Sequence, residues 1–164
     1  MVDTLIYPMG LYGCKASPTK DDDLAKLSKR FDIKVQEKPS HFLNMNIDVQ
    51  SPTRIKLSSE AYVLKMADKY VPNWRERAPL SQPATDRLPK AYEAAHAAAQ
   101  TRTSPPDPEL MKRYGGKVGA LIYTSPCARP DACYSISRCS RALTFPTAEL
   151  ESCADDIIVY LAQT

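Results

Sequence analysis

The 164-residue sequence predicts an α+β fold that is mostly α-helical and contains one small antiparallel β-hairpin. Apolar residues recur at helical spacing in several segments, most clearly over 130–143 and 148–162. A period-two alternation of apolar residues occurs only around 42–57. The 14 prolines, against 5 glycines, further predict short elements, because proline disrupts helix interiors and central strands.

The first 57 residues are expected to hold a short strand, a helix over 21–31 and the hairpin over 42–57. Asp21, Asp22 and Asp23 open the helix, where carboxylates favour the positive end of the dipole. Consecutive helical residues point in different directions, so these three aspartates are not expected to converge on a metal ion.

A second helix is expected over 58–71, with Ser58 or Ser59 as its cap and Pro72 beyond its end. The seven prolines of 72–108 predict a loosely held Pro/Ala-rich linker, in which an Ala-rich helix would have little to bury.

The last part of the chain, 109–164, is expected to be helical, with helices over 109–124, 130–143 and 148–162. The last of these is capped by Thr147. Gly115, Gly116 and Gly119 each cost about 1 kcal/mol inside a helix relative to alanine. Close packing against another element would explain their presence.

Composition is typical of a globular protein, with 43% hydrophobic and 25% charged residues and no apolar run near the length of a membrane span. The net charge of +3 permits contact with nucleic acid but does not require it. The odd number of five cysteines favours reduced thiols and hence an intracellular compartment, either cytoplasm, nucleus or an organelle interior.

No metal site is expected in this chain. Cys127, Cys133 and Cys139 are six residues apart, whereas zinc ligands usually come in tighter pairs, so these cysteines are expected to be buried small hydrophobes. His41 and His96 lie far apart in the sequence and suggest neither a base nor a ligand.

Eight short segments stand in a characteristic order and spacing. They are Leu27–Phe31, Phe42–Ile47, Ile55–Tyr62, Gly119–Tyr123, Ala128–Asp131, Ser137–Arg138, Phe145–Thr147 and Tyr160–Thr164. Together they resemble the reverse transcriptase of Ty1/copia-type retrotransposon polyproteins, from the end of the palm through the thumb and connection to the start of RNase H.

The resemblance implies an end-of-palm remnant over 1–57, with a primer-grip-like hairpin, a thumb-like helix over 58–71 and a thumb/connection-like region over 109–164. The intact parent enzyme would copy RNA into DNA with magnesium. Its Tyr-Val-Asp-Asp hairpin is matched only by Asp3, because Thr4 stands where the second aspartate belongs. Two-metal chemistry needs paired carboxylates, so the isolated chain is expected to be inactive and to need no cofactor.

In this role, an RNA–DNA or DNA duplex is the expected partner, held through its phosphate backbone. The residues that could contact it are Asn44, Asn46, Arg54, Lys56, Lys65, Lys69, Lys112, Arg113 and Lys117. Asn44 departs from the glycine that the family usually has there. An exposed polar sheet face and solvated helix faces are the alternative for these residues, while Arg129, Pro130 and Asp131 are expected to be structural.

Two interpretations of function therefore stay open. The chain is either a non-catalytic reverse transcriptase fragment that at most helps to bind template–primer, or a retroelement-derived structural subunit of a larger protein assembly. In the second case, the apolar helix faces within 110–122, 132–143 and 150–161 would pack against a partner.

Overall fold

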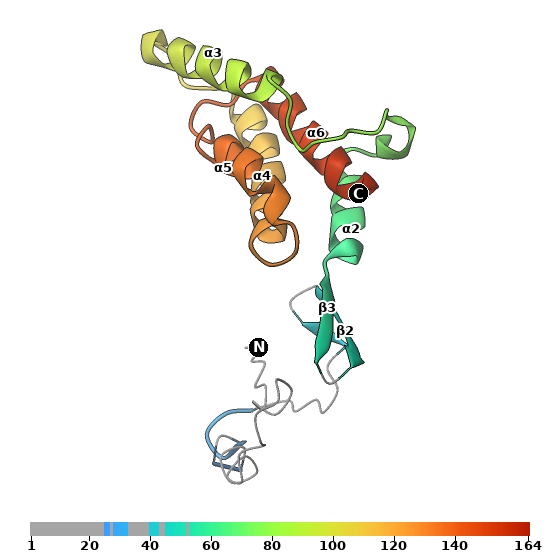
Figure 1. Cartoon of the computed structure of the whole chain (residues 1–164). Helices are drawn as coiled ribbons and strands as arrows, with labels where there is room; N and C mark the ends of the chain where they lie inside the picture. Colours follow the sequence, from blue (N-terminus) through green and yellow to red (C-terminus); the bar gives the residue numbers. More distant parts are fainter. Residues whose placement is uncertain (1–24, 27, 33–39, 43–44, 52) are drawn as a thin grey trace. The chain divides into compact units, whose positions relative to one another are not determined.

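The computed structural model describes residues 25–26, 28–32, 40–42, 45–51 and 53–164. The chain forms two compact units, an N-terminal unit, Met1–Ser58, and a helical unit, Ser59–Thr164. Helix predominates and the sheet is small and antiparallel, so the predicted fold class is confirmed (Figure 1). No helix among these residues has the length and apolarity to cross a membrane.

The N-terminal unit contains a three-stranded antiparallel sheet in the order β1 (His41–Phe42), β2 (Met45–Ser51) and β3 (Arg54–Ser58). The β2–β3 pair is the predicted hairpin, and the two-residue strand β1 adds to it. Residues 25, 26 and 28 are helical, while the rest of the helix expected over 21–31 is a turn or bend at 29–31 or lies outside the described residues.

One face of the hairpin is apolar, but most of it remains exposed. Ile47 is opposite Leu57 and Val49 is opposite Ile55, as the alternation of side chains along each strand requires. Ile47 is buried, whereas Val49 and Leu57 are each almost half exposed.

The helical unit begins with α2 (Glu60–Tyr70), followed by the short 3₁₀ helix η2 (Trp74–Glu76). Ser59 occupies the N-cap position of α2, as expected, but its side chain makes no capping hydrogen bond. After α2, the Trp74 indole N–H donates to the Asp68 carboxylate at 2.9 Å. This bond fixes the turn that follows the helix.

The segment 72–108 contains α3 (Arg87–Thr101), which corrects the expectation of a loosely held linker. Leu88, Ala91 and Ala95 are buried, and α3 contacts both α5 and α6. A helix that buries mostly alanine has only a narrow apolar stripe. The sequence of this stretch therefore gave little indication that the helix packs against others.

The remaining helices are α4 (Pro108–Ala128), α5 (Cys133–Ser140), which follows the 3₁₀ turn η3 (Pro130–Ala132), and α6 (Ala148–Gln163). Compared with the predicted ranges, α4 runs four residues further and α5 ends three residues earlier. Two caps are made by side chains, since Asp107 accepts from the Glu109 N–H and Thr147 from the Leu150 N–H. The expected Thr147 cap is confirmed.

Helix α6 is the centre of the helical unit, where it contacts α2, α3, α4 and α5 (Figure 1). Leu150, Ile157 and Ile158 on this helix are fully buried, and each contributes roughly 1.5–3 kcal/mol through burial. Tyr114 of α4 is fully buried too, and its hydroxyl donates to the Cys139 carbonyl at 2.8 Å. Its polar atom is thus satisfied within the core.

Close packing explains only one of the helical glycines convincingly. A Cβ at Gly116 would lie 3.3 Å from the Tyr70 hydroxyl oxygen, whereas a Cβ at Gly119 would meet nothing within 4 Å. At Gly115 the nearest atom would be a Leu143 methyl carbon at 4.0 Å, an ordinary contact. The expected packing therefore holds at Gly116 and fails at Gly119.

Candidate nucleic-acid interface

The hairpin carries three of the candidate residues within the described part of the chain, and Asn44 lies outside it. Arg54 and Lys56 of β3 are exposed, and Asn46 of β2 is half-buried. Lys56 is directly opposite Asp48, and charges of opposite sign at such positions attract each other. Asp48 also introduces a carboxylate into the face that a phosphate backbone would have to approach.

Helices α2 and α4 are joined by two tyrosine hydroxyls that donate to backbone carbonyls of α4. Tyr62 donates to Ala120 at 3.3 Å and Tyr70 donates to Gly116 at 3.1 Å. The ring centroids of Tyr62 and Tyr123 are 5.0 Å apart, and burial raises the pKa of Tyr62 above its usual value. The tyrosines hold α2 against α4.

Three of the candidate lysines lie at this α2–α4 pair and are exposed. Lys65 and Lys69 are one turn apart on α2, so they share a face of the helix. The Lys69 ammonium lies 4.7 Å from the Tyr70 ring centroid. Lys112 is one turn before Gly116 on α4. The three form no ion pair with a carboxylate in the described part of the chain.

The other two candidates on α4 face α6 and its carboxylates. The Lys117 ammonium lies 3.0 Å from Glu151 and 2.7 Å from Asp155, and the residue is only 8% exposed. Arg113 forms a bidentate pair with Glu151, with both nitrogen–oxygen distances 3.2 Å. Lys117 is therefore an internal cation of the helical unit, and it is not available on the exposed face of α4.

The carboxylates around Lys117 have pKa values shifted in opposite directions. Arg113 and then Lys117 hold the pKa of Glu151 below its usual range. Burial raises the pKa of Asp155, although its ion pair with Lys117 opposes this shift. The pair is thus largely buried, so removing one partner leaves a poorly compensated charge.

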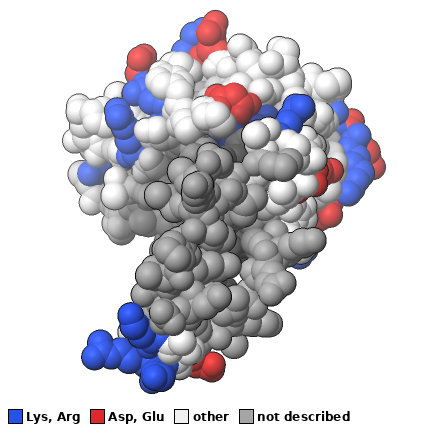
Figure 2. Space-filling view, turned by 60° about the horizontal axis from the view of Figure 1, so that its bottom comes forward, with Lys and Arg blue, Asp and Glu red and all other residues white. Residues whose placement is uncertain are grey.

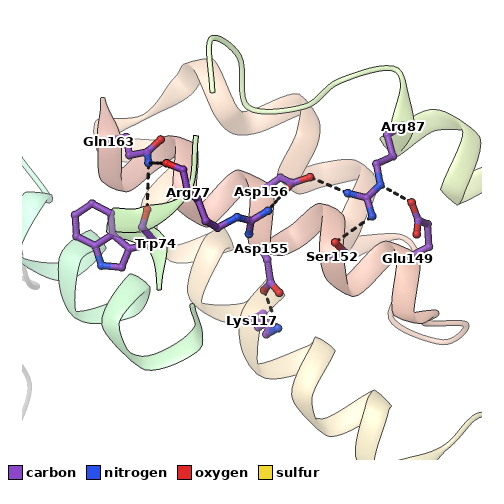
Figure 3. A network of polar contacts seen from close by, with 9 residues as sticks. All are labelled: Trp74, Arg77, Arg87, Lys117, Glu149, Ser152, Asp155, Asp156 and Gln163. Atoms are coloured by element: carbon purple, nitrogen blue, oxygen red, sulfur yellow. Dashed lines mark hydrogen bonds and ion pairs between the residues drawn. The ribbon is translucent and has the colours of Figure 1, made fainter. Parts of the chain in front are cut away.

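A second set of ion pairs joins the adjoining face of α6 to residues from the 72–108 segment (Figure 3). Arg77 bonds Asp156 at 2.5 Å, and Arg87 bonds Glu149, Asp156 and the Ser152 hydroxyl. Arg77 and Arg87 lie at the two ends of the connection between η2 and α3, so these contacts attach both ends of that connection to α6.

Gln163 closes the same network near the end of α6. Its amide nitrogen donates to the carbonyls of Trp74 and Arg77 at 3.1 and 3.0 Å (Figure 3). These bonds satisfy two backbone acceptors, one in η2 and one directly after it.

Sequence reasoning missed both sets of α6 ion pairs. The signal available was the spacing of acidic residues at i and i+4 within an otherwise apolar helix. This pattern is seen for Glu151 and Asp155. Carboxylates at such positions on a buried helix require cationic partners, because unpaired buried charges are costly.

Arg129, Pro130 and Asp131 form the junction between α4 and α5. Arg129 makes a bidentate pair with Asp131 at 3.1 and 2.9 Å and donates to the Leu161 carbonyl at 3.2 Å. The Tyr160 hydroxyl donates to the same carboxylate at 2.9 Å, and these donors lower the pKa of Asp131. The three groups tie the junction to the end of α6.

No group of three or more His, Cys, Asp or Glu side chains that could hold a metal ion occurs among the described residues, which do not include Asp3. Cys139 and Cys153 are buried, and burial raises their thiol pKa to about 12 and about 11. Cys133 is half-buried, and the side chain of Cys127 is outside the described part. The high pKa values keep the two buried thiols unreactive at neutral pH.

Charges of both signs occur among the described residues on the one face of the molecule that Figure 2 shows. Figure 2 shows lysine and arginine atoms beside aspartate and glutamate atoms in several places. A surface of this kind offers local clusters of cations rather than the long basic stripe of a strong nucleic-acid binder.

No family model matches the chain, and no solved structure matches it. The chain is 27% identical over 139 residues to the "Retrovirus-related Pol polyprotein from transposon TNT 1-94" of Nicotiana tabacum. The match covers 84% of this chain and 10% of that polyprotein, so the chain spans about a tenth of the length of its curated relative. This similarity supports the origin of the chain in a copia-type retrotransposon polyprotein.

Proposed function

We propose that these residues are a non-catalytic segment of a copia-type reverse transcriptase that helps to hold a template–primer duplex. The sequence similarity to a Pol polyprotein and the order of the short matching segments support this assignment. In this proposal, residues 1–57 derive from the end of the palm, 58–71 from a thumb helix and 109–164 from the thumb and connection.

The observation that carries the proposal is the division of the cations on α2 and α4. Arg113 and Lys117 are neutralised by carboxylates of α6, whereas Lys65, Lys69 and Lys112 are exposed. Exposed lysines held on two rigid helices can each neutralise one phosphate and release its counterion. Arg54 and Lys56 of β3 would add phosphate contacts of the same kind.

The test compares the binding of an RNA–DNA hybrid to the intact chain and to Lys65→Gln/Lys69→Gln. Losing two phosphate contacts should weaken binding at low salt and reduce the slope of log K against log salt by about 2. Lys90→Gln, an exposed lysine on α3, is the matched control and should leave affinity nearly unchanged. Equal slopes for the double variant and the intact chain would contradict the proposal.

No step of nucleotidyl transfer is assigned to residues of this chain. Such chemistry needs several carboxylate oxygens around two metal ions, and of the catalytic hairpin only Asp3 is matched. Purified chain with magnesium, a primed RNA template and deoxynucleotides is expected to give no extended primer. Primer extension by the intact chain would overturn the assignment as non-catalytic, whether or not the extension persists in an Asp3→Asn variant.

The alternative function, a structural subunit of a larger assembly, is favoured by the exposed apolar side chains of the helical unit. Ile122, Tyr134 and Leu143 expose 44%, 66% and 38% of their surface. Exposed apolar residues that gather in one patch mark interfaces, although single ones are common on any surface. Native mass measurement separates the two functions, since a stable complex favours the subunit and a lone monomer favours the duplex-binding segment.

A further inference from the structure

Four side chains form a cluster at the contact between α3 and α5, and none of them is among the nucleic-acid candidates named above. The Arg138 guanidinium carbon of α5 lies 4.2 Å from the Tyr92 ring centroid of α3. The Tyr92 and His96 rings are nearly parallel, at 8°, with centroids 6.1 Å apart. Phe145 stands edge-on to both, at 5.7 and 5.6 Å. His96 is exposed at the end of this stack.

Arg138 of α5 and Arg141, its C-cap residue one turn later, differ from most other arginines of the helical unit. Five arginines of the unit are each paired with a carboxylate, namely Arg75, Arg77, Arg87, Arg113 and Arg129. Arg138 and Arg141 form no ion pair with a described carboxylate. The Arg138 Nε atom is also buried without a hydrogen-bond partner in the described part of the chain.

Sites for single-stranded nucleic acid combine two components, aromatic rings and cations that are not already paired with carboxylates. Bases stack on aromatic faces and arginine planes, and neighbouring cations hold the phosphates. A duplex cannot use such a site in the same way, because the faces of its bases are already stacked on each other. The cluster therefore fits an unpaired base better than a paired one.

We infer that the Tyr92–His96–Arg138 stack is a binding site for single-stranded nucleic acid. The base stacks on the exposed His96 ring, and Arg141 and the outer nitrogens of Arg138 bind the adjacent phosphates. Tyr92 and Phe145 fix the orientation of the imidazole from behind and from the side. The site uses none of the α2–α4 lysines, so it goes beyond the duplex contacts proposed above and does not depend on them.

The test measures binding of a thymidine oligonucleotide of about twelve residues to the intact chain at low salt. His96→Ala should weaken binding about fivefold or more, the effect of losing one base–aromatic contact, while His96→Phe should retain it. Arg141→Gln should weaken binding and reduce the salt slope by about 0.7, the value for one phosphate of a single strand. Lys90→Gln is the control, because Lys90 lies on the opposite side of α3 from Tyr92.

All four variants change exposed residues, so their helix content by circular dichroism should equal that of the intact chain. Unchanged oligonucleotide affinity in His96→Ala, equal losses in the alanine and phenylalanine variants, or no binding by the intact chain would each overturn the inference. The cluster would then only pack α3 against α5. Duplex binding by Lys65→Gln/Lys69→Gln is measured separately, so failure of that proposal is distinguishable from failure of this one.

Discussion

Lys117 shows that the surroundings of a lysine determine whether it can contact a ligand. In sequence it is one of several lysines suited to phosphate contact, but in the structure its ammonium lies between Glu151 and Asp155 and is almost completely covered. Lys112, five residues earlier on the same helix, is exposed. Burial of the first lysine makes it a structural cation, and exposure of the second leaves it available to a ligand.

The pair Lys117→Met and Lys112→Met tests this difference. Lys117→Met leaves two carboxylates without their shared cation and should lower the free energy of unfolding by about 3 kcal/mol. Lys112→Met changes an exposed side chain and should stay within about 0.5 kcal/mol of the intact chain. Urea denaturation measures both, and equal stabilities for the two variants would contradict the ion-pair assignment.

The same cluster predicts a dependence of stability on pH. The pKa of Glu151 is held below its ordinary value of 4.5 in the folded chain, so the ionised form stabilises the fold. This contribution is complete above the unfolded pKa and disappears as the pH falls through the lower, folded pKa. Asp155 acts with the opposite sign, because burial raises its pKa above 3.8 and its contribution declines as the pH rises through the folded pKa.

Glu151→Gln isolates the Glu151 contribution. The intact chain should be more stable than the variant at neutral pH, and the difference in unfolding free energy should shrink as the pH falls from the unfolded pKa of about 4.5 through the lower, folded pKa of Glu151. Thermal or urea unfolding at a series of pH values measures this difference. A difference that is constant over the acid range would show that Glu151 is not held ionised by its partners.

At the scale of elements, α4 is shaped by its contacts with α2 and α6. Gly116 accepts the Tyr70 hydroxyl on its carbonyl, and a Cβ there would lie 3.3 Å from the same hydroxyl oxygen. Gly119 has open space above it. The two positions thus share a helix and a residue type but differ in what surrounds them.

Alanine substitutions at the two glycines should therefore have different effects. Gly119→Ala should raise the free energy of unfolding by roughly 1 kcal/mol, the gain in helix propensity with nothing to clash. Gly116→Ala should gain less or lose stability, since Tyr70 must shift and its bond to α4 is disturbed. Denaturant unfolding of both variants measures the difference, and equal gains would show that Tyr70 does not constrain Gly116.

The sequence predicts an element well when the residues that determine it lie close together in the chain, and poorly when they lie on different elements. Helix α6 and its Thr147 cap were predicted almost to the residue, because cap and apolar spacing lie within a few residues of each other. The burial of Lys117 could not be predicted, since its partners are more than thirty residues away on another helix. Helix α3 was missed as a packed element because Ala91 and Ala95 carry little apolar signal.

The candidate sites follow the same division. Lys65 and Lys69 were candidates because the segment 58–71 resembles a thumb helix, and both are exposed, as lysines on a surface helix usually are. The stack of Tyr92, His96 and Arg138 joins α3 to α5 and depends on their contact in space. Nothing in the local sequence around His96 indicated a site, because its neighbours on α3 are mostly alanines.

At the scale of the whole molecule, electrostatics limits what the chain can bind. Five arginines and Lys117 of the helical unit form ion pairs with carboxylates of α2, η3 and α6. Their positive charge is therefore largely neutralised within the unit. With a net charge of only +3, affinity for nucleic acid must come from a few local contacts. Binding should accordingly be weak and steeply dependent on salt.

The salt dependence of binding to an RNA–DNA hybrid is the most direct test of the central claim that this segment holds a duplex through a few exposed cations. The duplex contacts proposed involve Arg54, Lys56, Lys65, Lys69 and Lys112, so log K should fall linearly with log salt at a slope no steeper than about −4.5. A linear fall with a slope between about −2 and −4.5 is the predicted result. Binding that is independent of salt, or no binding even at about 20 mM salt, would contradict the account.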